Sequence, residues 1–275
     1  MLGHQLIYGA RRRRSTRGGG NRRSRTRATH TARLLVEHIG CYGNPMSSTP
    51  PAPGLGQVAA YRPWFREHVR PAGYSPLAHV LAHIGPPVAS CCYAASRLDR
   101  VSPLQWLTVP LMLLFGSAFV YWFHRFVLHR PTNPSSFAYQ RHTLQHHRFF
   151  DYDHITADER KDLHIMLFPW WSGLALSLIT LLASLALTPL IGSNVAHLIM
   201  LMSTGYLLLY EAVHTISHLP DQNVLTRLPV LSFLREHHRL HHEPALMGKH
   251  NFNIVIPLLD WLFGALLLRR PEKKR

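Results

Sequence analysis

The chain of 275 residues has few cysteines and few acidic residues, and both shortages narrow the kinds of protein it can be. Its three cysteines, Cys41, Cys91 and Cys92, form no CxxC pair. This argues against a disulfide-stabilised secreted scaffold and against a zinc ribbon. Only 14 residues are Asp or Glu, against 30 Lys or Arg, and no Glu occupies an HExxH-like position. A zinc-dependent hydrolase of that type is therefore disfavoured.

Much of the positive charge lies in the first 45 residues, which hold ten arginines and a single acid, Glu37. Such Arg-, Gly- and Pro-rich sequence cannot bury enough apolar surface to offset chain entropy. We expect residues 1–60 to be a disordered tail and residues 61–275 to form a membrane domain. The favoured interpretation is that translation starts at Met46. A nucleic-acid arm and an organelle-targeting segment are alternatives, and we expect no nucleic-acid partner.

Three long apolar runs predict helices that cross a membrane. Residues 106–123 and 165–192 are runs of 18 and 28 residues without a charge, and residues 195–209 form a third run. A helix needs about 20 apolar residues to cross about 30 Å of hydrocarbon. The third run continues to residue 219 with one acid, Glu211.

Two further runs are weaker. Residues 77–95 form a fourth candidate span, interrupted by Gly85-Pro86-Pro87, and the alternative is a broken interfacial helix. Residues 254–268 contain Pro257 and Asp260 and are expected to lie in the membrane interface. The predicted fold is an all-helical integral membrane bundle of about four spans with a cytoplasmic helical cap.

The order of the spans predicts which loops share a face. The connection at 190–196 is short and uncharged, so the last two long spans form a hairpin. Loops 124–164 and 219–251 and the tail 269–275 then share one face and carry most of the remaining Lys and Arg. By the positive-inside rule this face is cytoplasmic.

Of the 21 histidines, eleven fall in four groups with the sequences HRFVLH, HTLQHH, HTISH and HHRLHH. All four groups fall on the predicted cytoplasmic face, although the topology was derived only from apolar runs and Lys/Arg. The candidate ligands are His124, His129, His142, His146, His147, His214, His218, His238, His241 and His242.

The spacings within these groups are typical of metal ligands on helices. Histidines three or four residues apart share a helix face, as in the pairs His142/His146 and His214/His218. The i, i+3, i+4 set formed by His238 with His241 and His242 can point one way, which favours His238 over its neighbour His237.

Two spacings do not fit one face of an α-helix. His124 and His129 are five apart, about 140° around the helix, so they straddle a helix end or serve different metals. The same applies to the neighbours His146 and His147. A set divided between two nearby metals fits this pattern better than one four-coordinate site.

Ten histidines exceed the needs of one zinc, which takes three or four protein ligands. Imidazole suits Zn, Cu, Fe and Ni, and two irons with open positions for O2 would give the site a use. Glu211 lies one turn before His214 and is a candidate catalytic or hydrogen-bonding residue. Its alternative role is an interfacial carboxylate paired with an arginine.

The remaining histidines are expected to be mostly solvated or incidental. His154 and His164 lie on the same face as the groups but belong to no motif. Those without a fitting partner are His4, His30, His38, His68, His79, His83 and His197.

The four motifs, followed by HNFNIVIPLLDWLFG, resemble the fatty acid hydroxylase / sterol desaturase superfamily of integral membrane di-iron oxidoreductases. The resemblance covers roughly residues 75–268. It implies that the ten candidate histidines ligate two irons, that O2 is a co-substrate, and that the substrate is a lipid C–H bond. His250 is a less certain ligand, and Asn251 or Asn253 would support the ligands.

The predicted function is a membrane di-iron, O2-dependent hydroxylase acting on a fatty acyl or sterol-like lipid. No segment resembles a haem domain, so a separate cytochrome b5-like or ferredoxin-like donor is expected to supply electrons. The alternatives are a lipid desaturase of the same superfamily and a non-catalytic membrane metal-binding protein. Zinc is a possible metal in a purified form.

Overall fold

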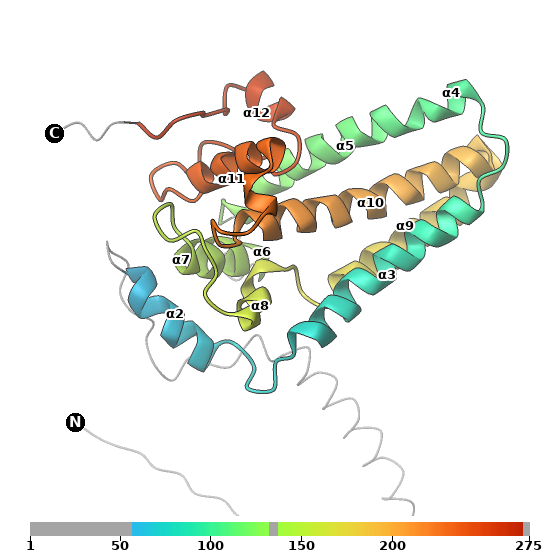
Figure 1. The fold of residues 1–275 in the computed structure, drawn as a ribbon. Coiled ribbons are helices and arrows are strands. Elements are labelled where there is room, and N and C mark those ends of the chain that lie inside the picture. The colour runs from blue at the N-terminus through green and yellow to red at the C-terminus, as the bar shows by residue number, and fades with distance from the viewer. Residues whose placement is uncertain (1–56, 132–136, 272–275) are drawn as a thin grey trace, which may run out of the picture. The chain divides into compact units, whose positions relative to one another are not determined.

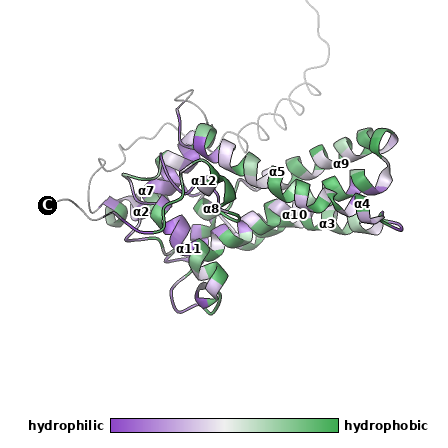
Figure 2. Ribbon diagram, turned by 90° about the horizontal axis from the view of Figure 1, so that it is seen from above, coloured by the Kyte–Doolittle hydropathy of each residue, from purple (hydrophilic) through white to green (hydrophobic). Residues whose placement is uncertain are grey.

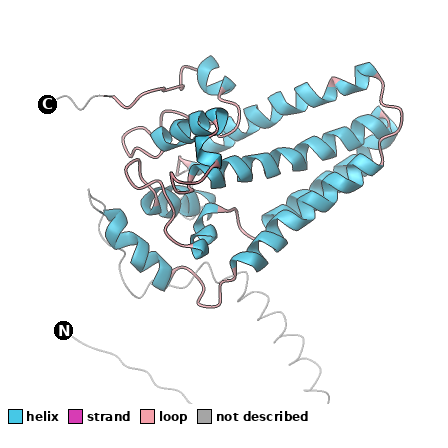
Figure 3. Ribbon diagram, viewed as in Figure 1, coloured by secondary structure: helices cyan, strands magenta, loops and turns pink. Residues whose placement is uncertain are grey.

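A computed structural model describes residues 57–131 and 137–271 of the chain, and the described residues form helices and loops without a strand (Figure 3). The longer helices are α2 (Gln57–His68), α3 (Pro76–Ser96), α5 (Thr108–Phe123), α9 (Ser172–Ile191), α10 (Ser193–Ser217) and α11 (Pro229–His241). The predicted disorder of residues 1–60 falls almost wholly outside the described residues, and α2 begins at Gln57, slightly before the predicted boundary.

Short helices complete the fold, and two of them have the wider π-helical turn. The π-helices are η1 (His124–Leu128), which continues α5, and η2 (Gln140–His146). The others are α4 (Pro103–Trp106), α6 (Phe137–Tyr139), α7 (His147–Phe149), η3 (Arg160–Asp162), α8 (Leu163–Met166), η4 (Leu225–Arg227) and α12 (Leu258–Leu262).

Three helical segments are long and apolar enough to cross a membrane: Pro103–Leu128, Ser172–Ile191 and Ser193–Ser217. They coincide with the three long apolar runs. Figure 2 shows hydrophobic residues along α5, α9 and α10 and mostly hydrophilic residues around α2, α7 and α11. The division follows from solvation, because only apolar side chains can face hydrocarbon at low cost.

Helix α3, the fourth candidate span, is one unbroken helix and does not meet the apolar criterion of the other three. It packs against α9 and α10. The alternative of a helix broken at Pro86-Pro87 is therefore wrong. Pro87 has no N–H to donate to the carbonyl of His83, but the helix tolerates the loss, and the backbone of Gly173 in α9 packs directly against this carbonyl.

The predicted hairpin between the last two spans is present. Helices α9 and α10 meet at Gly192, whose φ of +83° suits glycine. The α3–α4 loop lies at this same end, because the side chain of Asn194 bonds the backbone of Asp99 in both directions, at 3.0 and 2.7 Å. Figure 1 shows α7, α8, α11 and α12 gathered at the opposite end of α10.

This opposite end is a helical cap built around buried aromatic residues. Phe65 of α2 packs with Phe149 and Phe150 of the α7 region in one apolar cluster. The guanidinium of Arg62 in α2 donates to the carbonyl of Phe149 at 2.9 Å, and Arg66 pairs with the buried Asp162 at 2.6 Å. The segment 137–166 is thereby held against α2.

Candidate metal centre

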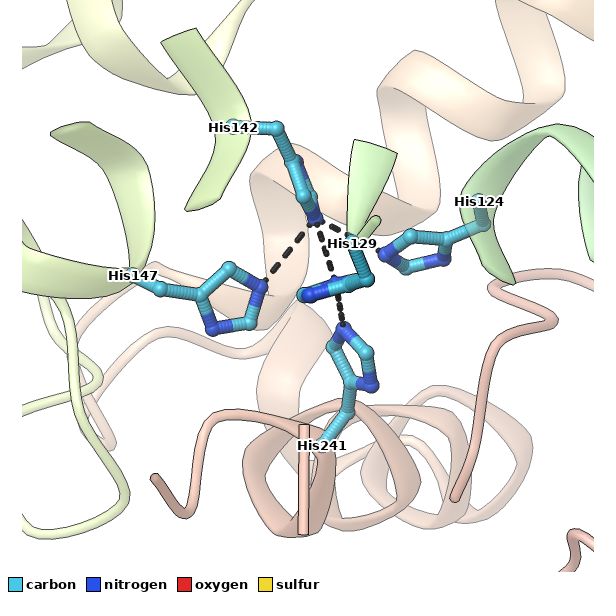
Figure 4. A group of neighbouring side chains, drawn as sticks. All are labelled: His124, His129, His142, His147 and His241. Carbon is cyan, nitrogen blue, oxygen red and sulfur yellow. Dashed lines mark hydrogen bonds between the residues drawn. The ribbon is translucent and has the colours of Figure 1, made fainter. Parts of the chain in front are cut away.

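Ten histidine side chains converge in the cap, and they are the ten that the sequence motifs single out. Nine of them form two groups in which the ring nitrogens lie within 4.8 Å of one another. The first group is His124, His129, His142, His147 and His241, shown in Figure 4. The second group is His146, His214, His218 and His238.

His142 is at the centre of the first group. Its Nε2 lies 2.8 Å from Nε2 of His124 and 3.1 Å from Nε2 of both His129 and His147. His241 completes the group, with its Nε2 2.9 Å from that of His129. Figure 4 shows the five rings pointing toward one another from separate parts of the chain.

The second group contains two pairs of imidazoles whose Nε2 atoms lie close together. Nε2 of His146 lies 3.3 Å from that of His214, and Nε2 of His218 lies 3.2 Å from that of His238. The tenth residue, His242, lies between the groups. Its Nε2 is 3.0 Å from that of His238, and its ring stacks on the ring of His147 with centroids 4.2 Å apart.

The two π-helices explain which histidines share a group. A π-helix bonds residue i to residue i+5, so residues five apart lie nearly above one another. His124 and His129 flank η1 in this way and join the same group, as do His142 and His147 across η2. His142 and His146 lie side by side as predicted, with stacked rings whose centroids are 5.4 Å apart, but their ring nitrogens belong to different groups.

Helix α11 also divides its histidines. His238 belongs to the second group and His241 to the first, while His242 follows the helix and lies between them. All three rings nevertheless lie together, with centroids 4.5–6.1 Å apart, as expected of side chains that point one way. His237 points elsewhere and bonds Asp260, in keeping with the preference for His238.

Hydrogen bonds from the ring Nδ1 atoms fix the orientation of six imidazoles. Backbone carbonyls accept at 2.5–3.1 Å from five of them, namely His124, His146, His218, His241 and His242. For the sixth, Thr143 Oγ1 gives its own proton to the Leu128 carbonyl and accepts from His129 Nδ1 at 3.2 Å. A proton on Nδ1 leaves the lone pair on Nε2, which faces the group.

Burial keeps the cap histidines in the neutral form that a metal requires. Desolvation, reinforced by the neighbouring imidazoles, holds the pKa of His142, His147 and His241 well below its usual value of 6.5. The same causes lower the pKa of His146 and His238 in the second group. Unprotonated rings with inward lone pairs are suited to binding cations.

The donor geometry fits metal ions better than hydrogen bonds among the rings. An imidazole nitrogen has one proton or one lone pair in the ring plane, so His142 Nε2 cannot bond three other Nε2 atoms. A metal at about 2.0–2.1 Å from each nitrogen places neighbouring ligand atoms about 2.9–3.4 Å apart. The observed separations of 2.8–3.3 Å agree with such an arrangement.

The segment around Asn251–Asn253 supports the first group from outside. Phe252 supplies the carbonyl that accepts from His124, and Asp260 accepts from the backbone N–H of Phe252 and of Asn253, each at 2.8 Å. Asn251, with a φ of +58°, donates through its amide to the carbonyl of His237 at 3.0 Å. His250 itself joins neither group, but its carbonyl accepts from His241.

Glu211 is buried one turn before His214 and contacts a residue that the sequence did not single out. Its Oε1 accepts from His83 Nε2 at 2.7 Å and from the backbone N–H of Phe168 at 3.0 Å. The side-chain partner of Glu211 is thus His83, whereas the alternative role expected an arginine. The expectation of incidental, solvated histidines is wrong for His79, His83 and His197, all of which are buried.

The two histidines without a motif take different positions. His154 is exposed and bonds Asp151 at 2.9 Å. His164 is buried between Phe65 and Tyr74 and belongs to neither group. Among the other incidental histidines, His4, His30 and His38 lie outside the described residues.

Two cavities open onto the centre. The larger, of about 430 Å³, lies between α5, α9 and α10 and reaches His124 through an almost wholly apolar lining. The smaller, of about 180 Å³, is lined by His142 of the first group and by His146 and His214 of the second. Both cavities share Phe123, Leu128, Phe168 and Tyr210, so these four side chains lie at their junction.

An all-helical membrane protein with a buried histidine centre suited to metal ions is the class that this arrangement defines. The sequence model of the fatty acid hydroxylase family matches residues 109–265, more than half of the chain, and the chain belongs to this family. A search of curated proteins and of solved structures finds no match.

Proposed function

We propose that the protein is a membrane di-iron, O2-dependent oxidoreductase that hydroxylates an aliphatic C–H bond of a lipid. The observation that carries the proposal is the apolar cavity of about 430 Å³ that runs between membrane-length helices and ends at His124 of the first histidine group. A pocket of this kind accepts hydrocarbon from a bilayer and offers it few polar partners. Membership of the fatty acid hydroxylase family supports the same reaction class.

The histidines form two candidate metal positions. The first group would hold one iron and the second group the other, with His242 between them. When bound, the two irons would supply the activation of O2 and the oxidation of the C–H bond. Imidazole also accepts zinc, so a purified form can contain zinc in place of iron.

The chain's own contribution is positioning and exclusion of water. The carbonyls of Phe252, Ile165 and Phe150 hold imidazole rings in place through their Nδ1 protons. The apolar walls of the larger cavity keep bulk water from the reacting carbon and place a hydrocarbon chain beside the histidines. No side-chain nucleophile is required by this chemistry.

Electrons must reach the centre from outside. Hydroxylation of a C–H bond by O2 consumes two electrons and two protons and releases one water. We propose a separate donor of the cytochrome b5-like or ferredoxin-like class, because the bundle and its cap account for the described residues.

The cap is proposed to lie on the cytoplasmic side, because the loops at that end carry most of the Lys and Arg of residues 61–275. Cysteine introduced at His154, exposed in the cap, should react with a membrane-impermeant thiol reagent only from the cytoplasmic side. Cysteine introduced at Arg100, at the other end, should react only from the opposite side. The reverse pattern would overturn the assignment.

Oxygen consumption combined with lipid profiling tests the function. Membranes containing the wild-type protein and a suitable electron donor should consume O2 and accumulate a hydroxylated lipid. The double variant His142→Ala/His241→Ala should lose more than the roughly 10–100-fold that changes around metal ligands cost. The variant His154→Ala is the matched control, since this histidine is exposed and outside both groups.

Other outcomes identify the alternatives. A lipid that gains a double bond without gaining oxygen would identify a desaturase. Bound metal with no O2 consumption on any lipid would identify a non-catalytic metal-binding protein. Full activity in the double variant would contradict the proposed centre.

A further inference from the structure

Four apolar or aromatic side chains line both cavities and therefore lie between them, namely Phe123, Leu128, Phe168 and Tyr210, which we name the collar. On one side of the collar lies the larger cavity between the membrane-length helices. On the other side lies the smaller cavity that faces both histidine groups. Any hydrocarbon that passes from the first cavity to the second must pass the collar.

Phe168 differs from the other collar residues because it lies in the loop between α8 and α9, not in a long helix. Its ring stacks on that of Tyr210, with centroids 5.3 Å apart and planes inclined by 13°. Tyr210 in turn stacks on His214 of the second group, with centroids 5.8 Å apart. Through these stacked rings, the position of Phe168 is coupled to Tyr210 and to the candidate ligand His214.

Side chains from two other helices hold both backbone polar groups of Phe168. Oε1 of Glu211 in α10 accepts from its N–H at 3.0 Å, and Nε2 of His79 in α3 donates to its carbonyl at 2.8 Å. A loop backbone that is bonded on both sides by buried side chains has little freedom to move.

His83 completes this support. The N–H of Gly173 donates to His83 Nδ1 at 3.2 Å, so the ring proton is on Nε2, which donates to Glu211 Oε1 at 2.7 Å. One oxygen of Glu211 therefore accepts from both His83 and Phe168. The other oxygen, Oε2, is buried without a hydrogen-bond partner.

We propose that Phe168 is a specificity-determining residue, and that Glu211, His83 and His79 are positioning residues that fix it at the collar and so set which carbon of a linear chain is oxidised. This inference rests on the proposed function. The hydrocarbon part of a lipid has no polar group that could anchor it beside the histidines. A fixed collar can hold it in one register relative to them through its shape alone.

The contacts of Glu211 allow an experiment to distinguish its positioning role from a role of its carboxylate in proton transfer. Because a single oxygen accepts both hydrogen bonds, the amide of Glu211→Gln can accept both and place its NH2 where Oε2 lies. Glu211→Leu removes both acceptors and frees the Phe168 backbone. Glu211→Gln should therefore behave as wild type, and Glu211→Leu should not.

The test measures the position of the new hydroxyl along a linear fatty acyl chain by mass spectrometry. Wild type and Glu211→Gln should favour one carbon. In Phe168→Ala and Glu211→Leu, the ratio of the main product to products at neighbouring carbons should fall about 10-fold, the scale at which pockets distinguish one methylene. Phe233→Ala is the matched control, because Phe233 is exposed and lines neither cavity, and its product position should not move.

A second measurement does not depend on turnover. Fatty acids with a photoreactive diazirine at successive carbons are bound to the purified protein under nitrogen, and labelled peptides are identified by mass spectrometry. In wild type and Glu211→Gln, only a narrow range of diazirine positions should label residues 165–171, whereas Phe168→Ala and Glu211→Leu should broaden that range.

The two readouts separate failure of the inference from failure of the function. Absence of any oxidised product from wild type would refute the proposed function. The labelling would still test whether the collar positions the hydrocarbon. Unchanged product positions and unchanged labelling in Phe168→Ala would overturn the inference while the function stands. A Glu211→Gln variant as impaired as Glu211→Leu would also overturn it, because the carboxylate itself would then be needed.

Discussion

An imidazole nitrogen serves one partner along its lone pair, yet Nε2 of His142 faces three other imidazole nitrogens within 3.1 Å. In a buried site, such crowding of acceptors is costly unless a shared cation satisfies them. In six of the ten rings the lone pair is aimed by a hydrogen bond on the opposite side of the ring, as in the pairing of His241 with the carbonyl of His250. A histidine of this centre is therefore suited to bind a metal only together with the hydrogen-bond partner that orients its ring.

Asp260 is the most connected of these supports. It accepts from the N–H groups of Phe252 and Asn253 at 2.8 Å and from His237 at 3.2 Å, and it is fully buried. Asp260→Ala leaves three buried donors unpaired, so we expect the free energy of unfolding to fall by about 3 kcal/mol or more. Because Phe252 holds His124, metal affinity should also fall about 10–100-fold.

Thermal unfolding in detergent and metal titration measure the two effects of Asp260→Ala. The control is Asp221→Ala, which removes an exposed carboxylate paired with Arg235 and should cost less than about 1 kcal/mol. Equal stability of the two variants would show that the contacts of Asp260 do not support the centre.

The sequence identified the ten clustered histidines by residue type and spacing, because a motif of this kind is local. It could not identify His83. Its partner Glu211 is 128 residues away, and nothing near His83 in the chain distinguishes it from a solvated histidine. Only the packing of α3 against α10 brings the two together.

At the scale of helices, the π-helical turns decide how the ligands divide. An α-helical period of 3.6 residues predicts His142 and His146 on one face, and their rings do stack, but the wider turn of η2 places His147 with His142 in the first group. Hydrogen-bond pattern, not residue type, distinguishes a π-helix from an α-helix. The spacing of five residues in both HRFVLH and HTLQHH was the available signal.

Helices α3 and α9 approach each other through a single glycine. A Cβ at Gly173 would lie 1.8 Å from the carbonyl oxygen of His83, so no side chain fits there. We expect Gly173→Ala to push the helices apart and to lower the free energy of unfolding by about 3 kcal/mol, at the upper end of overpacking costs. It should also disturb the bond from Gly173 to His83.

The matched control for Gly173→Ala is Gly85→Ala in α3, where a Cβ would meet no atom within 4 Å. This change should stabilise the helix by about 0.5–1 kcal/mol, because alanine loses less backbone entropy than glycine. Thermal unfolding of both variants in detergent measures the difference. A Gly173→Ala variant as stable as Gly85→Ala would contradict the close contact.

At the scale of the whole described region, hydrophobic helices and a polar cap meet at the histidines (Figure 2). Hydropathy predicted this division, since runs of 18 or more apolar residues are a strong signal. It did not predict the two cavities, because a cavity depends on how side chains from α5, α9 and α10 fill the space between them. The fourth span stays a prediction, because α3 contacts the bundle but is less apolar than the three candidate spans.

The central claim is that ten imidazoles form two metal positions, and the metal content of the freshly purified protein tests it most directly. Elemental mass spectrometry measures the metal concentration, which is divided by the protein concentration. The result should be two metal ions per protein chain. The variants His142→Ala and His218→Ala, one from each group, should each retain fewer. Fewer than two metal ions per wild-type chain, or two in both variants, would contradict the account.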